Sequence, residues 1–246
     1  MSGDKFFELW VYLAATPLAG LTITLVAYTV GFAIYMHAKL HPLANPVLIA
    51  VIAIVISLRV GDVAYGTYFA GAQFVHFLLG PAVVGLAVPL ARAWPTVSRL
   101  SVPVAGALAA GSAVALGLAV GIAWALGASP GTLASLAPKS VTAPIAMGIA
   151  ERIGGVAALA AVFTVATGII GAGLGKLVFD KVGVRDMRAR GFALGLAAHG
   201  IGTARAFQVS AEAGTYAGLA FGLHGVLAAV LLPYIWRLTQ LLAGKF

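Results

Sequence analysis

The sequence predicts an all-α protein that crosses a membrane several times as a bundle of helices. Hydrophobic residues make up 61% of the 246 residues and charged residues only 9%, whereas soluble domains carry about a quarter of charged residues. Apolar runs recur along the whole length. We therefore expect a single membrane domain over residues 1–246, with no room for a soluble module beyond loops and ends.

Apolar segments separated by polar or proline-containing connections predict about seven spans and one re-entrant half-helix. The stretch at residues 1–17, set off by Pro17, is expected to form an interfacial segment or to extend the first span. The expected spans are 18–37, 44–60, 74–92, 100–126, 153–178, 190–210 and 213–238.

The formal net charge of +8 comes from basic residues in the short connections, so it indicates topology rather than nucleic-acid binding. The densest basic group lies in one loop, which we place in the cytoplasm, and the pairs Arg92/Arg99 and Arg237/Lys245 are expected on the same side. Alternation of the spans then requires that residues 138–150 do not cross, and 13 residues are too few to do so as a helix. The basic loop contains Lys176, Lys181, Arg185, Arg188 and Arg190.

The same alternation makes the units 44–126 and 153–238 run in opposite directions, as in the inverted repeats of secondary transporters. Each unit has a helix break, at Gly80-Pro81 and at residues 199–203, which would serve as a gating element. The alternative is that the two units resemble each other only by chance, because any membrane protein rich in glycine and proline contains such breaks. A proline-kinked helix without a ligand is equally open for Gly80-Pro81.

The segment at residues 138–146 combines a lysine, hydroxyl groups and two prolines among apolar runs. Pro138 and Pro144 interrupt helical pairing, so amide donors near Ser140, Val141 and Thr142 are expected to be free. Together with the charge of Lys139, such donors suit a small carboxylate. The alternative is that Lys139 extends to the interface and the prolines only end a loop.

A second interrupted segment places a histidine, a hydroxyl group and an arginine around two glycines. His199 could couple proton movement to a substrate, and Arg205 could bind a carboxylate or Glu212. The helix would be interrupted at Gly200 and Gly202, with Thr203 on the face of His199. A histidine that only bonds to a neighbouring helix is the alternative.

The sequence contains few residues that could carry out catalysis or bind a cofactor. The chain has no cysteine and only seven acidic residues, without paired acids, a metal-ligand cluster or a nucleophile–histidine spacing. We therefore expect neither an enzyme nor a cofactor or metal. Gly171/Gly175 and Gly117/Gly121 instead have the GxxxG spacing that allows helices to approach closely in lipid.

Four motifs carry a resemblance to a known family: LLGPAVVGLAVPL at 78–90, LAPKSVTAPIAMGI at 136–149, IGGVAALAAVFTVATGIIGAGLG at 153–175 and AAHGIGTARAF at 197–207. Over roughly residues 20–235 the chain resembles LrgB/CidB-family membrane proteins. It departs at Ala143, where that family commonly has threonine, and at Gly200, where alanine is common.

The resemblance implies one of two functions. Bacterial relatives are described as holin- or antiholin-like effectors of murein hydrolase activity and lysis, acting with a small LrgA/CidA-type partner. A plastidial relative that resembles this chain in its C-terminal half exports glycolate and glycerate, and some bacterial pairs are associated with pyruvate uptake. The interrupted, charged segments favour the second function, because buried ionisable groups usually mark substrate pathways.

We therefore expect a secondary transporter of small monocarboxylates that works by alternating access in the plasma (inner) membrane, with proton coupling as an option. A homodimer and an LrgA/CidA-type partner are also expected. The antiholin-like effector is the alternative. Expected substrate-binding residues are Lys139, Ser140, Thr142, His199, Thr203 and Arg205, and expected helix breaks or gates are Gly80, Pro81, Pro138, Pro144, Gly200 and Gly202.

Overall fold

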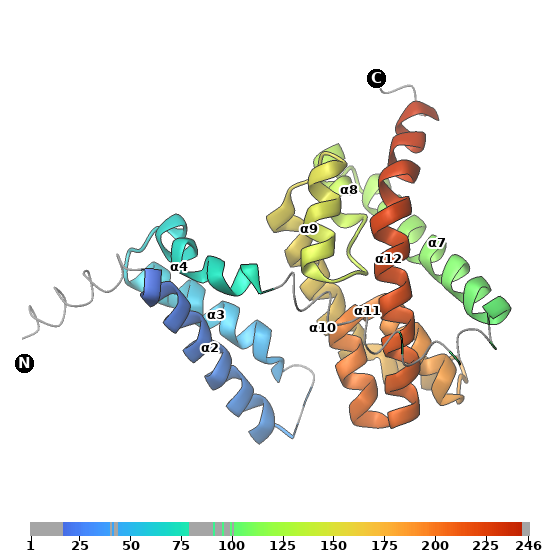
Figure 1. The fold of residues 1–246 in the computed structure, drawn as a ribbon, viewed down its shortest axis with the longest axis horizontal. Coiled ribbons are helices and arrows are strands. Elements are labelled where there is room, and N and C mark those ends of the chain that lie inside the picture. Colours follow the sequence, from blue (N-terminus) through green and yellow to red (C-terminus); the bar gives the residue numbers. More distant parts are fainter. Residues whose placement is uncertain are drawn as a thin grey trace, which may run out of the picture. The chain divides into compact units, whose positions relative to one another are not determined.

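The computed structural model describes residues 17–78, apart from 40, 42 and 43, the single positions 91, 95 and 99, and residues 101–242. Regular structure in these residues is helical. The chain divides into two compact units, Met1–Val84 and Gly85–Phe246, and Figure 1 shows the helices of each.

The first unit contains α2 (Pro17–His37), α3 (Pro46–Val60) and α4 (Tyr65–Phe77). Two glycines of α2 bring its neighbours close. A Cβ at Gly20 would collide with the Tyr68 carbonyl of α4, and one at Gly31 would lie 2.6 Å from the Pro46 carbonyl of α3. Helix α4 begins in the stretch that the sequence analysis had left between two spans and includes the first residues of the span expected over 74–92. Its predicted continuation toward residue 92, with Gly80 and Pro81, lies outside the described residues, as does the predicted interfacial segment before residue 17.

The second unit contains α7 (Ser101–Ala125), α8 (Pro130–Leu136), α9 (Ala143–Arg152), α10 (Ala157–Lys181), α11 (Met187–Val209) and α12 (Ala211–Leu242). In Figure 1, the red α12 runs the length of this unit, with the α8–α9 pair beside one part and the orange α11 beside the other. By length and composition, four described helices are able to cross a membrane, namely α2, α7, α10 and α12, and α3 is a shorter apolar helix. These residues do not confirm the predicted number of seven spans.

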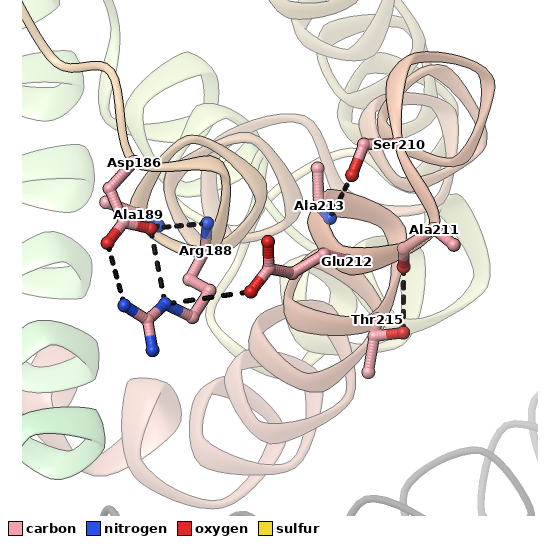
Figure 2. Close-up of polar contacts among 8 residues, drawn as sticks. All are labelled: Asp186, Arg188, Ala189, Ser210, Ala211, Glu212, Ala213 and Thr215. Atoms are coloured by element: carbon pink, nitrogen blue, oxygen red, sulfur yellow. Dashed lines mark hydrogen bonds and ion pairs between the residues drawn. The ribbon is translucent and has the colours of Figure 1, made fainter.

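Helix α11 folds back on itself and is not the single span predicted over 190–210. Its backbone leaves helical geometry at Ala198 (φ −118°, ψ 15°) and His199 (φ 43°, ψ −135°). Its first turn lies beside the start of α12, where Arg188 Nε is 3.8 Å from Glu212 Oε1 (Figure 2). Because α12 begins two residues after α11 ends, both ends of α11 lie together. The segment is therefore a hairpin of two half-helices with its tip at residues 198–199.

The segment between α7 and α10 forms a second hairpin. Short helix α8 leads to a tip at residues 137–142, and α9 returns. The base is closed by Ser135, whose Oγ accepts a hydrogen bond of 2.8 Å from the Val156 amide ahead of α10. A Cβ at Gly155 would lie 2.8 Å from the Ser135 amide. The predicted half-helix after Pro138 thus corresponds to α9, while the sequence analysis had missed α8.

Small residues set the packing around the α11 hairpin. A Cβ at Gly171 would lie 2.6 Å from the Ala198 Cβ, and one at Gly175 would lie 3.0 Å from Leu194 Cδ1, so the close packing predicted for this glycine pair is confirmed. On the side of α12, a Cβ at Gly195 would overlap the carbonyl group of Ala217. At Gly117 and Gly121, by contrast, a Cβ would meet no described atom within 4 Å.

The hairpins change the topology. Helices α7, α10 and α12 are candidate spans, and the hairpins follow α7 and α10 in turn, so they enter from opposite faces. A half-helix of ten residues, such as α9, rises about 15 Å, half of a hydrocarbon core of about 30 Å. Both tips can therefore reach the middle of the membrane. Because the two hairpins enter from opposite faces, residues 101–152 and 157–209 are the two halves that run in opposite directions. The sequence analysis had expected these halves to be 44–126 and 153–238.

One expectation about sidedness is wrong. Because α11 doubles back, α12 starts on the face of the basic loop and ends on the other one, carrying Arg237 away from that loop.

The absence of native cysteine makes the sidedness testable. We expect a cysteine at Arg185, in the loop between α10 and α11, and one at Thr239, near the end of α12, to react with a membrane-impermeant maleimide from opposite sides of sealed vesicles. Labelling of both from the same side would contradict the α11 hairpin.

The packing of α11 on α12 predicts a second outcome. Gly195→Ala places a methyl group against backbone, which cannot move aside as a side chain can, so we expect it to lower the free energy of unfolding by about 1–3 kcal/mol. The matched control is Gly117→Ala, which meets open space and should have no destabilising effect. Thermal unfolding of both variants in one detergent compares them, and equal stability would contradict the close contact.

Candidate functional site

The tip of the first hairpin carries the predicted lysine segment. Pro138 and Ser140 are buried, and Lys139 is half-buried, with its Nζ donating a hydrogen bond of 3.2 Å to Ser140 Oγ. The expectation of free amides needs one correction, because the Val141 amide donates to the Pro138 carbonyl at 3.2 Å and closes a turn. The segment is thus a structured turn that holds an ammonium group at the tip.

Unpaired donors do occur at the start of α9. Thr142 is in the N-cap position but its side chain caps no amide, and Pro144 lies in the first turn. Thr142 Oγ1 is buried and has no partner in the part of the chain that the structure describes. The first amides of a helix have no partner within the helix. The first tip therefore has three features that favour binding of a carboxylate, namely the Thr142 hydroxyl, the N-terminus of α9 and the charge of Lys139.

The second tip is organised by His199, which is 4% exposed. Its Nε2 is 2.9 Å from the carbonyl oxygen of Thr164 on α10. Because a carbonyl only accepts, Nε2 carries the proton, and in the neutral ring Nδ1 is an acceptor. Gly168 provides the room for this contact, since a Cβ there would lie 2.9 Å from His199 Nε2. The Thr164 hydroxyl is buried without a partner among the described residues.

The other predicted residues of this segment have different positions. The break falls at residues 198–199 and not at Gly200 or Gly202, although Gly202 is needed for the hairpin because a Cβ there would lie 2.6 Å from the Leu194 carbonyl. Thr203 Oγ1 donates to the His199 carbonyl at 2.8 Å and thereby stabilises the tip.

Arg205 is not brought to the tips. Its Nη1 donates to Gln208 Oε1 at 3.1 Å. Glu212, a possible partner from the sequence, pairs instead with Arg188 at 3.8 Å. Figure 2 shows Arg188 between Glu212 and Asp186. The hydrogen bond from the Arg188 side chain, followed by the amides of Arg188 and Ala189, holds the pKa of Asp186 below its usual value.

The two tips lie near one another. Lys139 is an electrostatic neighbour of His199 and also of His224, a residue of α12 that the sequence analysis had passed over. His224 is 7% exposed, and its Nδ1 lies 2.9 Å from Ser112 Oγ of α7. An ionisable group inside a long apolar run is the signal that would have found it. The structure thus brings Lys139, His199 and His224 near one another, with the Ser112 and Ser140 hydroxyls beside them.

Two separate hollows are lined by residues of the first tip. A cavity of about 280 Å³ between α7, the tip and α12 is lined by Ser112, Pro138, Ser140 and His224 among apolar residues. A groove of about 910 Å³ along α7 and the first half of α11 is lined by Lys139. The groove also reaches Asp186 and Arg188 at the start of α11. Successive residues of one tip therefore face separate hollows.

No group of three metal-ligating side chains occurs within the described ranges. The predicted gate residues Gly80 and Pro81 fall outside those ranges, so the site consists of the two tips, α10 and the Ser112–His224 pair.

Fold and site together define a helical membrane protein with two re-entrant hairpins whose tips carry polar groups. The LrgB-like family model matches residues 24–238. The chain therefore belongs to the LrgB-like family.

Similar proteins support the assignment. The chain is 33% identical to the uncharacterised protein YxaC of Bacillus subtilis over 213 residues, 87% of this chain and 92% of the relative. It is 31% identical to an uncharacterised protein of Haemophilus influenzae, over 79% of this chain and 84% of the relative. It is 28% identical to the antiholin-like protein LrgB of Bacillus mycoides, over 89% of this chain and 95% of the relative. No solved structure matches.

The second tip yields a prediction about stability. His199→Leu keeps a bulky side chain but leaves the Thr164 carbonyl without its donor, so we expect a loss of about 1–3 kcal/mol in the free energy of unfolding. The control is Gly200→Ala at the next position, where a Cβ would lie 4.0 Å from Phe221 Cζ and therefore has room. Thermal unfolding measures both. A harmless His199→Leu would show that the hydrogen bond does not hold the tip.

Proposed function

We propose that this protein is a secondary transporter of small monocarboxylates of the pyruvate, glycolate or glycerate class. The observation that carries the proposal is the tip of the first hairpin, where Lys139, the unpartnered Thr142 hydroxyl and the N-terminus of α9 lie together. Each favours an anion, and a lysine at membrane depth is costly unless it serves such a purpose.

The two hairpins support an alternating-access mechanism. Half-helices that enter from opposite faces and end near the midplane are a recurring arrangement in secondary transporters. In the proposed mechanism, Lys139 provides the charge, and Ser140 and Thr142 orient the carboxylate. His199 is the candidate proton carrier, because its Nδ1 remains an acceptor while Nε2 is bound to Thr164. Thr203 acts through the tip backbone, and Arg205 has no direct part.

A second function is favoured by a different observation. Relatives that match 89% of this chain carry the name antiholin-like protein LrgB, and this name favours an effector of lysis over a transporter. On that proposal the protein acts through assembly in the membrane, and the polar tips need bind no solute. Permeability separates the two functions, because a holin-like assembly lets large, unrelated solutes pass.

Further parts of the proposal concern the protein's surroundings. We place it in the plasma (inner) membrane, as a homodimer that acts with a small LrgA/CidA-type membrane protein and has no catalytic activity. The charged loop before α11, which holds Lys181 and Arg185, would face the cytoplasm.

Uptake of radiolabelled pyruvate and glycolate into proteoliposomes, with and without an LrgA-like partner, tests the proposal. We expect saturable uptake that Lys139→Ala reduces about tenfold or more, since a hydrogen bond to a charged group contributes about 1.5–3 kcal/mol.

The matched control is Lys181→Ala, which removes an equal charge at the exposed end of α10 and should leave uptake unchanged. Leakage of large dyes at the rate of pyruvate entry would contradict transport and favour the holin-like function. Equal uptake by Lys139→Ala and the unaltered protein would remove Lys139 from the mechanism.

A further inference from the structure

The cavity between α7, the first tip and α12 has a polar end and apolar walls. Ser112, Ser140 and His224 provide the polar groups, and Leu116, Leu227 and Leu231 belong to the apolar wall. Buried polar side chains cost free energy unless they are paired. Ser140 is paired with Lys139, and Ser112 with His224, but each hydroxyl keeps further hydrogen-bonding capacity that a polar ligand head can use and a lipid tail cannot.

The polar end has donors to offer. Ser140 Oγ accepts the hydrogen bond from Lys139 Nζ at 3.2 Å, so the hydroxyl hydrogen of Ser140 remains available to an oxygen atom in the cavity. The Ser112–His224 hydrogen bond of 2.9 Å joins α7 to α12 at the cavity wall, and Lys139 acts electrostatically on His224. Lys139 lines the neighbouring groove, but its Nζ lies 3.2 Å from Ser140 Oγ, so a positive charge stands directly behind the Ser140 hydroxyl and favours a carboxylate at this end of the cavity.

The size of the cavity limits the rest of the ligand. Its volume is about 280 Å³, whereas an apolar cavity of roughly 150 Å³ in another protein is enough to hold benzene, a six-carbon ring. A three-carbon acid would leave much of the apolar wall uncovered. The wall instead fits an aliphatic chain, which gains about 0.8 kcal/mol for each buried methylene group.

We propose that this cavity binds the aliphatic side chain of 2-oxo or 2-hydroxy monocarboxylates of about four to six carbons, with their polar head at Ser140 and the Ser112–His224 pair. The inference rests on the proposed transport function and narrows its substrate class. It also assigns α7 and α12 a part in specificity, whereas the hairpin tips provide the charge.

The test is a comparison of pyruvate with 4-methyl-2-oxopentanoate, a branched six-carbon acid, on the purified full chain in nanodiscs. Affinities are measured by isothermal calorimetry, and uptake is measured in proteoliposomes. We expect the six-carbon acid to bind about tenfold more tightly or better. Ser112→Ala should weaken both acids, because it removes a polar contact at the head.

Variants that fill the cavity with a larger side chain should affect the binding of the two acids differently. Ala113→Leu, on the cavity wall, should weaken the six-carbon acid about tenfold and change pyruvate less than about twofold. Ala110→Leu, three residues earlier on an exposed face of α7 and away from the cavity lining, is the matched control and should change neither. Ala228→Leu fills the same cavity from α12 and serves if the first variant does not fold.

Three results would overturn the inference. One is that the protein transports pyruvate but shows no preference for the six-carbon acid, or that Ala113→Leu weakens the binding of both acids equally. This result would leave the transport function standing. Another is a co-purified lipid, detected by mass spectrometry, that Ala113→Leu expels while acid binding is unchanged. The last is failure of the unaltered protein to bind or transport any acid, which overturns the transport function as well.

Discussion

Peptide groups at a hairpin tip in the middle of a membrane must find partners within the protein, since lipid offers none. The rest of the second unit depends on this constraint. At the second tip, the His199 ring bonds to the Thr164 carbonyl and the Thr203 hydroxyl to the His199 carbonyl. The first of these bonds requires α10 to approach closely, and Gly168 and Gly171 make that approach possible. The Ser135 hydroxyl performs the same task at the base of the first hairpin.

This arrangement leaves a small number of polar groups uncommitted at the two tips. Within the part of the chain that the structure describes, the Thr142 hydroxyl has no partner, and Lys139 Nζ donates a hydrogen bond to its neighbour Ser140. His199 has one nitrogen engaged and one left as an acceptor. Of these groups, Lys139 lines the groove along α7 and the first half of α11. The antiholin-like names of relatives give no account of a lysine in this position.

Much of the second unit could be predicted from the sequence, but not its path through the membrane. Charge alternation and the two prolines predicted a half-helix beside Lys139, and α9 fits that prediction. The sequence predicted an interruption near His199 but not a reversal, because 190–210 was read as one interrupted span. The Arg188–Glu212 pair and the contact of Gly191 with Ala213 show that the ends of α11 meet. The Ser112–His224 pair joins residues 112 positions apart, a distance over which spacing rules say nothing. Arg205 looked equivalent to Lys139 in the sequence yet lies away from the tips.

The central claim is that the first tip holds the carboxylate of a transported acid. A structure of the protein with a bound monocarboxylate tests it most directly. The account predicts carboxylate oxygens within hydrogen-bond distance, about 2.7–3.2 Å, of the tip at residues 138–142, with Lys139, Ser140 or Thr142 as donors. A carboxylate bound away from this tip, with Lys139 still paired to Ser140 alone, would contradict the account.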